Sequence, residues 1–368
     1  MLTGLLGIHL ILKIGKSQPT RAPYNVMTAL KHVQVTNDAK GADGFQMTFS
    51  LGKDKMGEYT LWESGLLDPE TRVQIGAIIG LSTAPIIDGL IDHHQVKASS
   101  QPGQSTLTVS GSDISVKMNL KDKGVPYPAQ SDSGIVEQIL NKYATFKITP
   151  AVTKTKEYPS VQQRTPHQTN LSDLDYIKDL AERNGFVFYI EPDSLGENIA
   201  YWGPEKREGI AQPPLNVNMA SATNVLSLDF THDALSPINV SGHRLDPETK
   251  KSIPVDGKAE RNPPYAKTEG KAIKEVVMKC LANKDPGVAD TLAKAKATNA
   301  PQPVSATGSL DTVRYGGLLR ARKSVTVSGA GRRNDGKYIV SSVTHEIEPG
   351  KYTQQFTLTR EGNDPKGM

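Results

Sequence analysis

The sequence predicts a β-rich α+β protein in which two similar β units flank an α+β middle segment. Three observations lead to this fold class. Apolar residues alternate in short runs through the first third of the chain, helical spacing and an aromatic strand mark the middle, and alternating runs return after residue 224. Alternation is typical of strands with one buried face, whereas a spacing of three to four residues is typical of helices.

The first third of the chain reads as short antiparallel strands. Residues 29–35 and 45–51 both alternate, and the polar link between them contains Gly and Asp, so they form a predicted hairpin. Further short strands are predicted over residues 73–75, 88–91 and 105–109. Strands at this close spacing favour a barrel or a sandwich, and we assign residues 1–115 to a first β domain.

The middle third, residues 116–220, is predicted to be an α+β domain. Helical spacing covers residues 132–143, and a second helix begins after Ser172, whose hydroxyl can cap the Asp175 amide. Gly185 suits the C-terminus of that helix. The run that follows, residues 186–190, is aromatic and β-branched without alternation, which predicts a strand covered on both faces.

The last third, residues 221–368, is predicted to be a second β domain with a charged helical insertion at about 244–309. Two helices are expected in the insertion, over residues 269–282 and 288–298, with lysine-rich faces in solvent. The strands expected around it cover residues 225–230, 237–240, 324–328, 337–343 and 352–358.

An internal echo links the two β domains. Asp88-Gly89 and Asp335-Gly336 each precede a strand-like run, and a second glycine follows at the same distance in both, at Gly103 and Gly350. Because glycine accepts a positive φ, each Asp-Gly pair is predicted to form the turn that starts a hairpin. The sequence therefore predicts two similar β units, one at each end of the chain.

The composition limits the classes of function. The 43 Lys and Arg residues nearly balance 39 Asp and Glu residues, so the net charge is only +4 and predicts no specific nucleic-acid or membrane binding. The hydrophobic fraction of 37% and the aromatic fraction of 6% are lean for a compact monomer, which favours a protein that buries surface against partners. Cys280 is the only cysteine, which excludes an intramolecular disulfide and a CxxC zinc site, and we expect it inside a helix.

No motif in the sequence nominates a chemical site. The stretch from Gly329 to Gly331 lacks the lysine of a phosphate-binding loop, and His93 and His94 would point to opposite faces of a strand and so could not chelate together. A pair of carboxylates for glycoside hydrolysis stays open, because such pairs meet only in the fold. We therefore predict no catalytic, cofactor-binding or metal-binding residue, no cofactor, and no enzymatic activity.

The apolar opening segment, residues 1–14, is interpreted as a first strand with an exposed lead. No basic residue precedes its apolar run, Lys13 interrupts it, and no small-residue cleavage site follows. We therefore expect no signal peptide and assembly in the bacterial cytoplasm.

The middle segment and the closing strands resemble a known family. The motifs that carry the likeness are a strand-end G-x-D, a capped helix ending in A-E-x-x-G before an aromatic strand, and the closing strands with their turns, at residues 111–113, 172–189, 314–318, 325–331, 335–345 and 352–360. They are similar to the phage late control protein D family, the baseplate hub proteins of contractile tails, which share their fold with the base of VgrG proteins. The likeness covers about two-thirds of the chain by motif. VgrG proteins continue into a spike, whereas the motifs here stop at Arg360, so we expect the spike to be a separate protein.

The resemblance implies a fold of two tail-tube-like antiparallel β-barrel domains around the α+β insert, and a structural function. Three chains with two such domains each would form a ring of six, a symmetry adaptor between a six-fold tail tube and a three-fold spike. The partners implied are other copies in a homotrimer, a separate spike protein, a tail tube or tube-initiator protein, and other baseplate proteins, including the tape measure. The location implied is a virion tail baseplate or a phage-tail-like particle.

Two other functions stay open at this stage. One is the spike base of a secretion system that carries effectors, and the other is a glycan hydrolase at a tail tip. The scattered acidic residues of the first and last thirds motivate the hydrolase.

Overall fold

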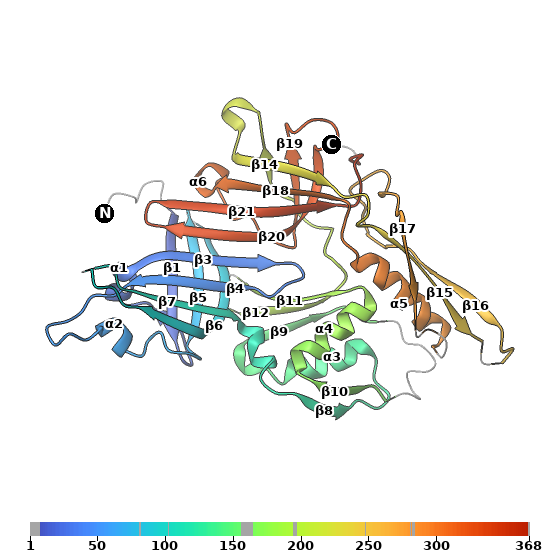
Figure 1. Cartoon of the computed structure of the whole chain (residues 1–368), viewed down its shortest axis with the longest axis horizontal. Helices are drawn as coiled ribbons and strands as arrows, with labels where there is room; N and C mark the ends of the chain where they lie inside the picture. The colour runs from blue at the N-terminus through green and yellow to red at the C-terminus, as the bar shows by residue number, and fades with distance from the viewer. Residues whose placement is uncertain are drawn as a thin grey trace.

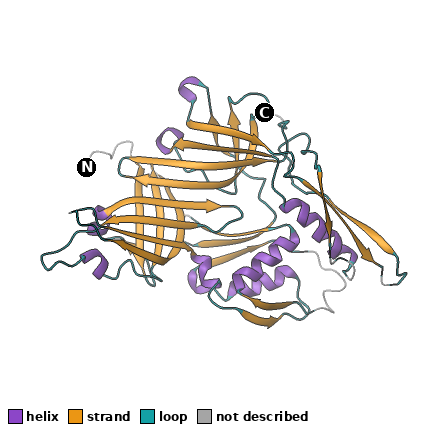
Figure 2. Cartoon of the chain, in the orientation of Figure 1, coloured by secondary structure: helices purple, strands orange, loops and turns teal. Residues whose placement is uncertain are grey.

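The computed structural model describes residues 8–80, 82–101, 103–155, 165–193, 197–246, 248–279, 281 and 284–366. Cys280 and residues 1–7, including most of the predicted exposed lead, lie outside the described residues. The predicted β-rich α+β fold is confirmed: a 13-stranded sheet dominates, and three small sheets and a few helices surround it (Figure 1, Figure 2). In the described part, none of the helices has both the length and the apolar composition needed to span a bilayer.

The first β unit occupies the N-terminal part of the large sheet. Its strands lie in the order β3-β4-β7-β6-β5-β1, all antiparallel, with the short β2 beyond β1. Its elements are β1 (Ile8–Gly15), β2 (Thr20–Arg21), α1 (Tyr24–Ala29), β3 (Leu30–Asp38), β4 (Gly44–Ser50), α2 (Thr60–Glu63), β5 (Arg72–Ile79), β6 (Ser82–Lys97) and β7 (Thr106–Asp113).

The second β unit forms the C-terminal part of the same sheet. Its strands lie in the order β14-β18-β21-β20-β19-β13. Its elements are β13 (Gln212–Asn216), η4 (Ala220–Ala222), β14 (Val225–His232), β18 (Val304–Asp311), α6 (Thr312–Tyr315), β19 (Ser324–Ser328), β20 (Gly336–Glu348) and β21 (Lys351–Arg360).

The two units have the same connectivity. In chain order β1, β3, β4, β5, β6 and β7 take the places of β13, β14, β18, β19, β20 and β21, and the short helices α2 and α6 occupy equivalent links. One outer strand differs in direction, because β1 is antiparallel to β5 whereas β13 is parallel to β19. The units join edge to edge through β3 and β20, which run side by side in Figure 1. The chain therefore folds one strand plan twice.

The middle segment packs two helices with small sheets. Its elements are η1 (Ile114–Met118), β8 (Lys123–Pro126), α3 (Asp132–Asn141), η2 (Ala144–Phe146), β9 (Ile148–Val152), β10 (His167–Leu171), α4 (Asp173–Asn184), β11 (Val187–Pro192) and β12 (Asn198–Gly203). The prediction for α4 is confirmed: the Ser172 hydroxyl accepts from the Asp175 amide at 3.0 Å, and Gly185 ends the helix with φ +68°. Its apolar side packs into a core that surrounds Trp202.

The insertion in the second unit differs from its prediction. It consists of β15 (Ile238–Leu245), β16 (Ser252–Gly257), β17 (Lys274–Met278) and α5 (Pro286–Asn299). The helix predicted over 269–282 is wrong, because its centre is the strand β17, where the β-branched Val276 and Val277 pair in parallel with β15. The helix predicted over 288–298 is confirmed as α5. The described part of the insertion is thus a three-stranded sheet with one helix, rather than a helical insertion.

One predicted turn is also wrong. Asp88 and Gly89 lie inside β6 instead of starting it, whereas Asp335 and Gly336 do stand at the β19–β20 turn. A Cβ at Gly89 would lie 2.3 Å from the Ser112 carbonyl oxygen, so this glycine serves the close approach of two strands. The turns of the β6–β7 and β20–β21 hairpins are instead made near Gly103 and Gly350, with φ +75° and +80°.

Candidate functional site

The joint between the two β units is a fully formed antiparallel ladder. Residues of β3 pair with β20 from Asp38 opposite Ser342 to Val33 opposite Ile347. On the inner face the β3 residues Val33 and Val35 are 1% and 0% exposed. The ladder therefore seals the edge of the first unit against the second.

The outer face of this joint is polar and specifically paired. Glu346 accepts from the Gln34 amide at 2.6 Å, and its other oxygen lies 2.6 Å from His32 Nε2. One step along, the hydroxyls of Thr36 and Thr344 are 3.2 Å apart. Cross-strand pairs of this kind fix the register of two strands.

A buried ion pair anchors the same joint. Arg322 precedes β19 in the second unit, and its guanidinium lies 2.5 Å from the Asp43 carboxylate of the first unit and over the Tyr189 ring of the middle segment. Asp113, close to Asp43, is buried, and burial together with the Asp43 charge raises the pKa of Asp113 to about 6. One guanidinium thus ties three parts of the chain together.

A second buried ion pair joins the first unit to the middle segment. The Arg72 guanidinium binds both oxygens of Asp88 at 2.8 and 2.6 Å, and the Asn198 amide donates to the same carboxylate at 3.0 Å. Both charged side chains are less than a tenth exposed. Asp88, predicted to form a turn, is therefore an anchor for the neighbouring domain.

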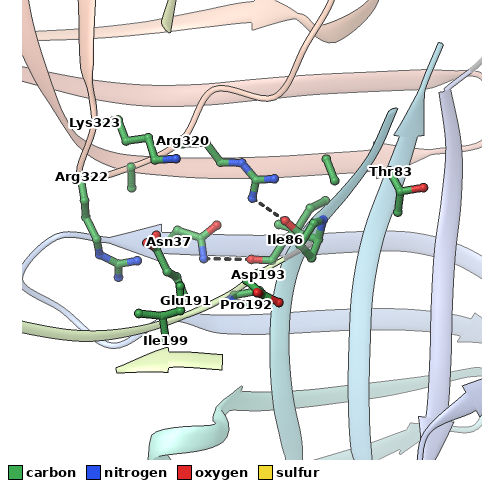
Figure 3. A pocket seen from close by; sticks show the side chains of 13 residues that line it. Asn37, Thr83, Ile86, Glu191, Pro192, Asp193, Ile199, Arg320, Arg322 and Lys323 are labelled. Carbon is green, nitrogen blue, oxygen red and sulfur yellow. Dashed lines mark hydrogen bonds between the residues drawn. The ribbon is translucent and has the colours of Figure 1, made fainter. Parts of the chain in front are cut away.

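A cavity of about 320 Å³ opens where the three parts meet. Arg320, on its wall, donates to the Pro85 carbonyl, and Asn37 donates to the Ile86 carbonyl at 3.4 Å (Figure 3). Glu191 and Lys323 also line it. Because Arg320 and Arg322 already bind carbonyl and carboxylate oxygens of the neighbouring unit, we interpret the cavity as a polar seam between units.

The two histidines considered as ligands are separated as expected for neighbours on a strand. His93 is exposed, whereas the half-buried His94 ring lies 4.3 Å from the Trp62 ring. Within the described ranges, no group of three or more His, Cys, Asp or Glu side chains is arranged to hold a metal ion.

Among the described residues, the short strands β2 and β13 each pair on one side only, and two longer strands of the large sheet also have unpaired edges. β14 pairs only with β18, so its other edge is open. β6 pairs with β5 only up to Leu90, so on that side its second half, from Asp92 to Lys97, is also open. An open edge presents unpaired backbone groups that another strand can bind, and these two edges are the candidate assembly site.

β-bulges at matching positions show which residues of the two β units correspond, and therefore what each open edge corresponds to in the other unit. In the pairing with β4, β3 has a bulge at Lys31, and β14 has one at Leu226 in the pairing with β18. In the same way β6 has a bulge at Asp92, and β20 has one at Ser341. The open β14 edge is thus the counterpart of β3, and the open half of β6 is the counterpart of the half of β20 that binds β3.

Neither the buried ion pairs nor the open edges could be found by sequence motifs. Arg322 and Asp43 are far apart in sequence and stand in ordinary loop-like contexts. The glycine echo of the sequence falls on two hairpins that are counterparts, β6–β7 and β20–β21, but it does not give their register, because Gly89 lies inside β6 whereas Gly336 is the first residue of β20.

Comparison with known proteins assigns the family. The model of the family described as the Alg8 N-terminal domain matches residues 22–349. The chain belongs to this family. No curated protein matches the sequence at a significant level.

Solved structures show the fold of this Alg8 N-terminal domain chain. A tail protein from Neisseria meningitidis MC58 aligns with 97% of this chain and 98% of its own at 12% identity, with a TM-score of 0.61. The 43 kDa tail protein of prophage MuSo2 from Shewanella oneidensis aligns with 96% of this chain and 99% of its own, at 12% identity and a TM-score of 0.64.

A third similar structure comes from a secretion system. It is an E. coli protein described as a component of the type VI secretion system, with 14% identity, 96% of this chain and 79% of that chain covered, and a TM-score of 0.59. The chain therefore shares its fold with phage tail and secretion-system proteins. At these identities the likeness concerns the fold.

Proposed function

We propose that this protein is the central hub of a contractile-tail or injection-system baseplate, of the kind found in the late control protein D family. In this role three copies form a ring that joins a six-fold tail tube to a three-fold spike. We assign its β domains to residues 1–115 and 221–368 and the middle domain to 116–220. The role is mechanical, and no catalytic step is assigned to any residue.

The duplication of the strand plan carries this proposal. Two β units with the same connectivity and matching bulges lie side by side in one chain, joined through β3 and β20. A chain that presents the same unit twice offers a trimer six similar units, which suits contact with a six-fold partner. The shared fold with phage tail proteins over almost the whole chain agrees with this role.

The proposed partners are those that the resemblance to the late control protein D family implies, and the duplicated strand plan is compatible with them. One face of the ring would meet the tail tube or a tube-initiator protein, and the other a spike protein, with further baseplate proteins or the tape measure in contact. The proposed location is the baseplate of a virion tail or of a phage-tail-like particle.

The mass of the purified chain in solution tests the proposal. Light scattering and native mass spectrometry are expected to give three copies, and the trimer is expected to bind tube and spike subunits from the same gene cluster. A chain that stays monomeric at high concentration and binds neither subunit contradicts the proposal. Turnover of peptidoglycan that a single carboxylate substitution abolishes would instead support the hydrolase.

A second candidate role is the spike base of a secretion system that carries effectors. The likeness to the type VI component favours it, since that structure aligns with nearly all of this chain. Gene neighbours separate the two roles, because genes for a membrane complex would accompany only the secretion system.

A further inference from the structure

We propose that β14 of one copy pairs in antiparallel fashion with the second half of β6 of the next copy, in the register that β3 and β20 adopt within the chain. This inference rests on the proposed oligomeric hub and specifies its interface. It commits to a second copy of this chain as the occupant of both open edges.

The internal joint provides the template for this pairing. Counted from the matching bulges, Val35 corresponds to Phe230, and His345 corresponds to Val96. Within the chain Val35 lies directly opposite His345. The same relation places Phe230 opposite Val96 of the neighbouring copy, two apolar side chains on the inner face of the sheet.

The inward apolar side chains of β14 are less buried than those of β3, as expected for a strand whose neighbour is absent. Val33 and Val35 are fully buried beneath β20. Their counterparts Leu228 and Phe230 pack against the core of the second unit but are only partly buried. A neighbouring strand would cover them as β20 covers β3.

The outer face of the proposed joint is complementary in charge. Gln34 lies opposite Glu346 within the chain, and the corresponding residues between copies are Asp229 and Lys97. Both side chains are exposed, and no ion pair within the described residues involves either. Opposite charges that face each other across two strands stabilise one register over its alternatives.

The proposed contact joins two different surfaces of the chain, so it determines whether the assembly closes into a ring. Each copy offers β14 and receives a strand at β6, so the contact is heterologous, and such contacts close into rings when the rotation permits. The rotation that relates the first unit to the second within the chain is then repeated between chains.

A disulfide between two engineered cysteines tests the register. In a Cys280→Ser background, Thr231→Cys combined with Gln95→Cys is expected to form a bond between copies, because these positions correspond to Thr36 and Thr344. The positive control is Thr36→Cys with Thr344→Cys, whose hydroxyls are 3.2 Å apart within one chain. It should give an oxidised band at the mass of one chain, whereas the test variant should give ladders on a non-reducing gel.

A shifted pair and a charge exchange sharpen the test. Thr231→Cys with His93→Cys, displaced by two residues, should cross-link at least tenfold less. Asp229→Lys and Lys97→Asp should each weaken self-association about fivefold, and their combination should restore it. Oligomers that form without the 95–231 bond overturn the proposed register and leave the hub role standing, whereas a chain that never associates overturns both.

Discussion

The edge strands β3 and β14 follow the same plan and differ in what covers them. Both have a bulge near the start and two inward apolar side chains, yet Val35 is 0% exposed while Phe230 is only partly buried. The difference comes from the neighbour, since β20 covers β3 and no described strand covers the outer edge of β14. The chain thus shows a completed joint and an open one on the same scaffold.

The links between equivalent strands differ as well. A tight polar link in which the backbone amides of Lys40 and Gly41 bind Asp38 joins β3 to β4. At the corresponding place Asp233 accepts from the Leu235 amide at 2.9 Å, but the chain then continues through β15, β16, β17 and α5 before β18. Surface links tolerate such insertions at low cost in loop entropy, so the strand plan survives it.

The largest expected loss of stability follows substitution of Arg322, whose counterpart in the first unit is Glu70. Both residues have a positive φ, 66° and 67°, and each donates its amide to the strand just before a bulge. Arg322→Ala leaves the buried Asp43 carboxylate without its partner and should lower the free energy of unfolding by about 3–5 kcal/mol. Chemical denaturation measures this loss.

Glu70→Ala is the matched control for Arg322. Its side chain is exposed, so the same substitution at the same backbone conformation should change the free energy of unfolding by less than about 0.5 kcal/mol. Equal losses in the two variants would show that the backbone, and not the ion pair, sets the cost.

The next effect concerns acid sensitivity at His345, the counterpart of Val96. Burial, with a smaller contribution from Arg320, lowers the pKa of His345 to about 3. As the pH falls below about 6.5, His345 is protonated in the unfolded chain but stays neutral in the folded chain. The free energy of unfolding is therefore fully present above about pH 6.5 and decreases as the pH falls. Between pH 7 and pH 4.5 the burial of His345 should lower the free energy of unfolding by about 3 kcal/mol.

His345→Gln is expected to remove that acid-dependent loss, measured as unfolding free energy against pH. A variant that keeps the full pH slope would rule out His345 as its origin.

Asp113 should act with the opposite sign. Its pKa of about 6 lies above the ordinary 3.8, so the folded chain holds a proton that the unfolded chain releases. Its stabilising neutral form is fully present below about pH 4 and lost as the pH rises through 6. Asp113→Asn, which keeps an oxygen for the Ser115 amide, should stabilise the chain at pH 8 by about 2 kcal/mol.

Calorimetry at pH 8 and at pH 4 checks the Asp113 prediction. The gain should disappear at pH 4, and a gain that is the same at both values would contradict the assignment.

The smallest effect tests the equivalence of the two hairpin turns. Gly103 and Gly350 have φ of +75° and +80°, and an added Cβ meets no atom within 4 Å at either. Gly103→Ala and Gly350→Ala should therefore each cost about 1 kcal/mol, from backbone strain alone. Thermal melts of the two variants should agree, and a large difference would break the equivalence of the turns.

Local patterns predicted the local elements well. The Ser172 cap and the Gly185 terminus specify α4 through contacts within a few residues. The glycine echo falls on two counterpart hairpins, but its equal spacing is not a structural equivalence, because Gly89 lies inside β6 and Gly336 begins β20. Asp88-Gly89 misled the turn prediction, because a buried ion pair with Arg72 and a close strand approach give that dipeptide a different role. The strand β17 was misassigned because its lysine-rich flanks resemble a helix surface, while its pairing with β15 decides its structure.

The candidate site depends on contacts that no local pattern encodes. His32 and Glu346 meet across 314 positions of the chain, and the pairing of β3 with β20 brings them together. The unpaired edge of β14 becomes evident only by comparison with the equivalent strand β3, which is paired with β20.

A three-dimensional reconstruction of the purified assembly by electron cryo-microscopy tests the central claim most directly. It should contain three copies in a ring of six similar β units, with β14 of each copy hydrogen-bonded to β6 of the next. A ring of another copy number, or β14 edges left in solvent within a trimer, would contradict it.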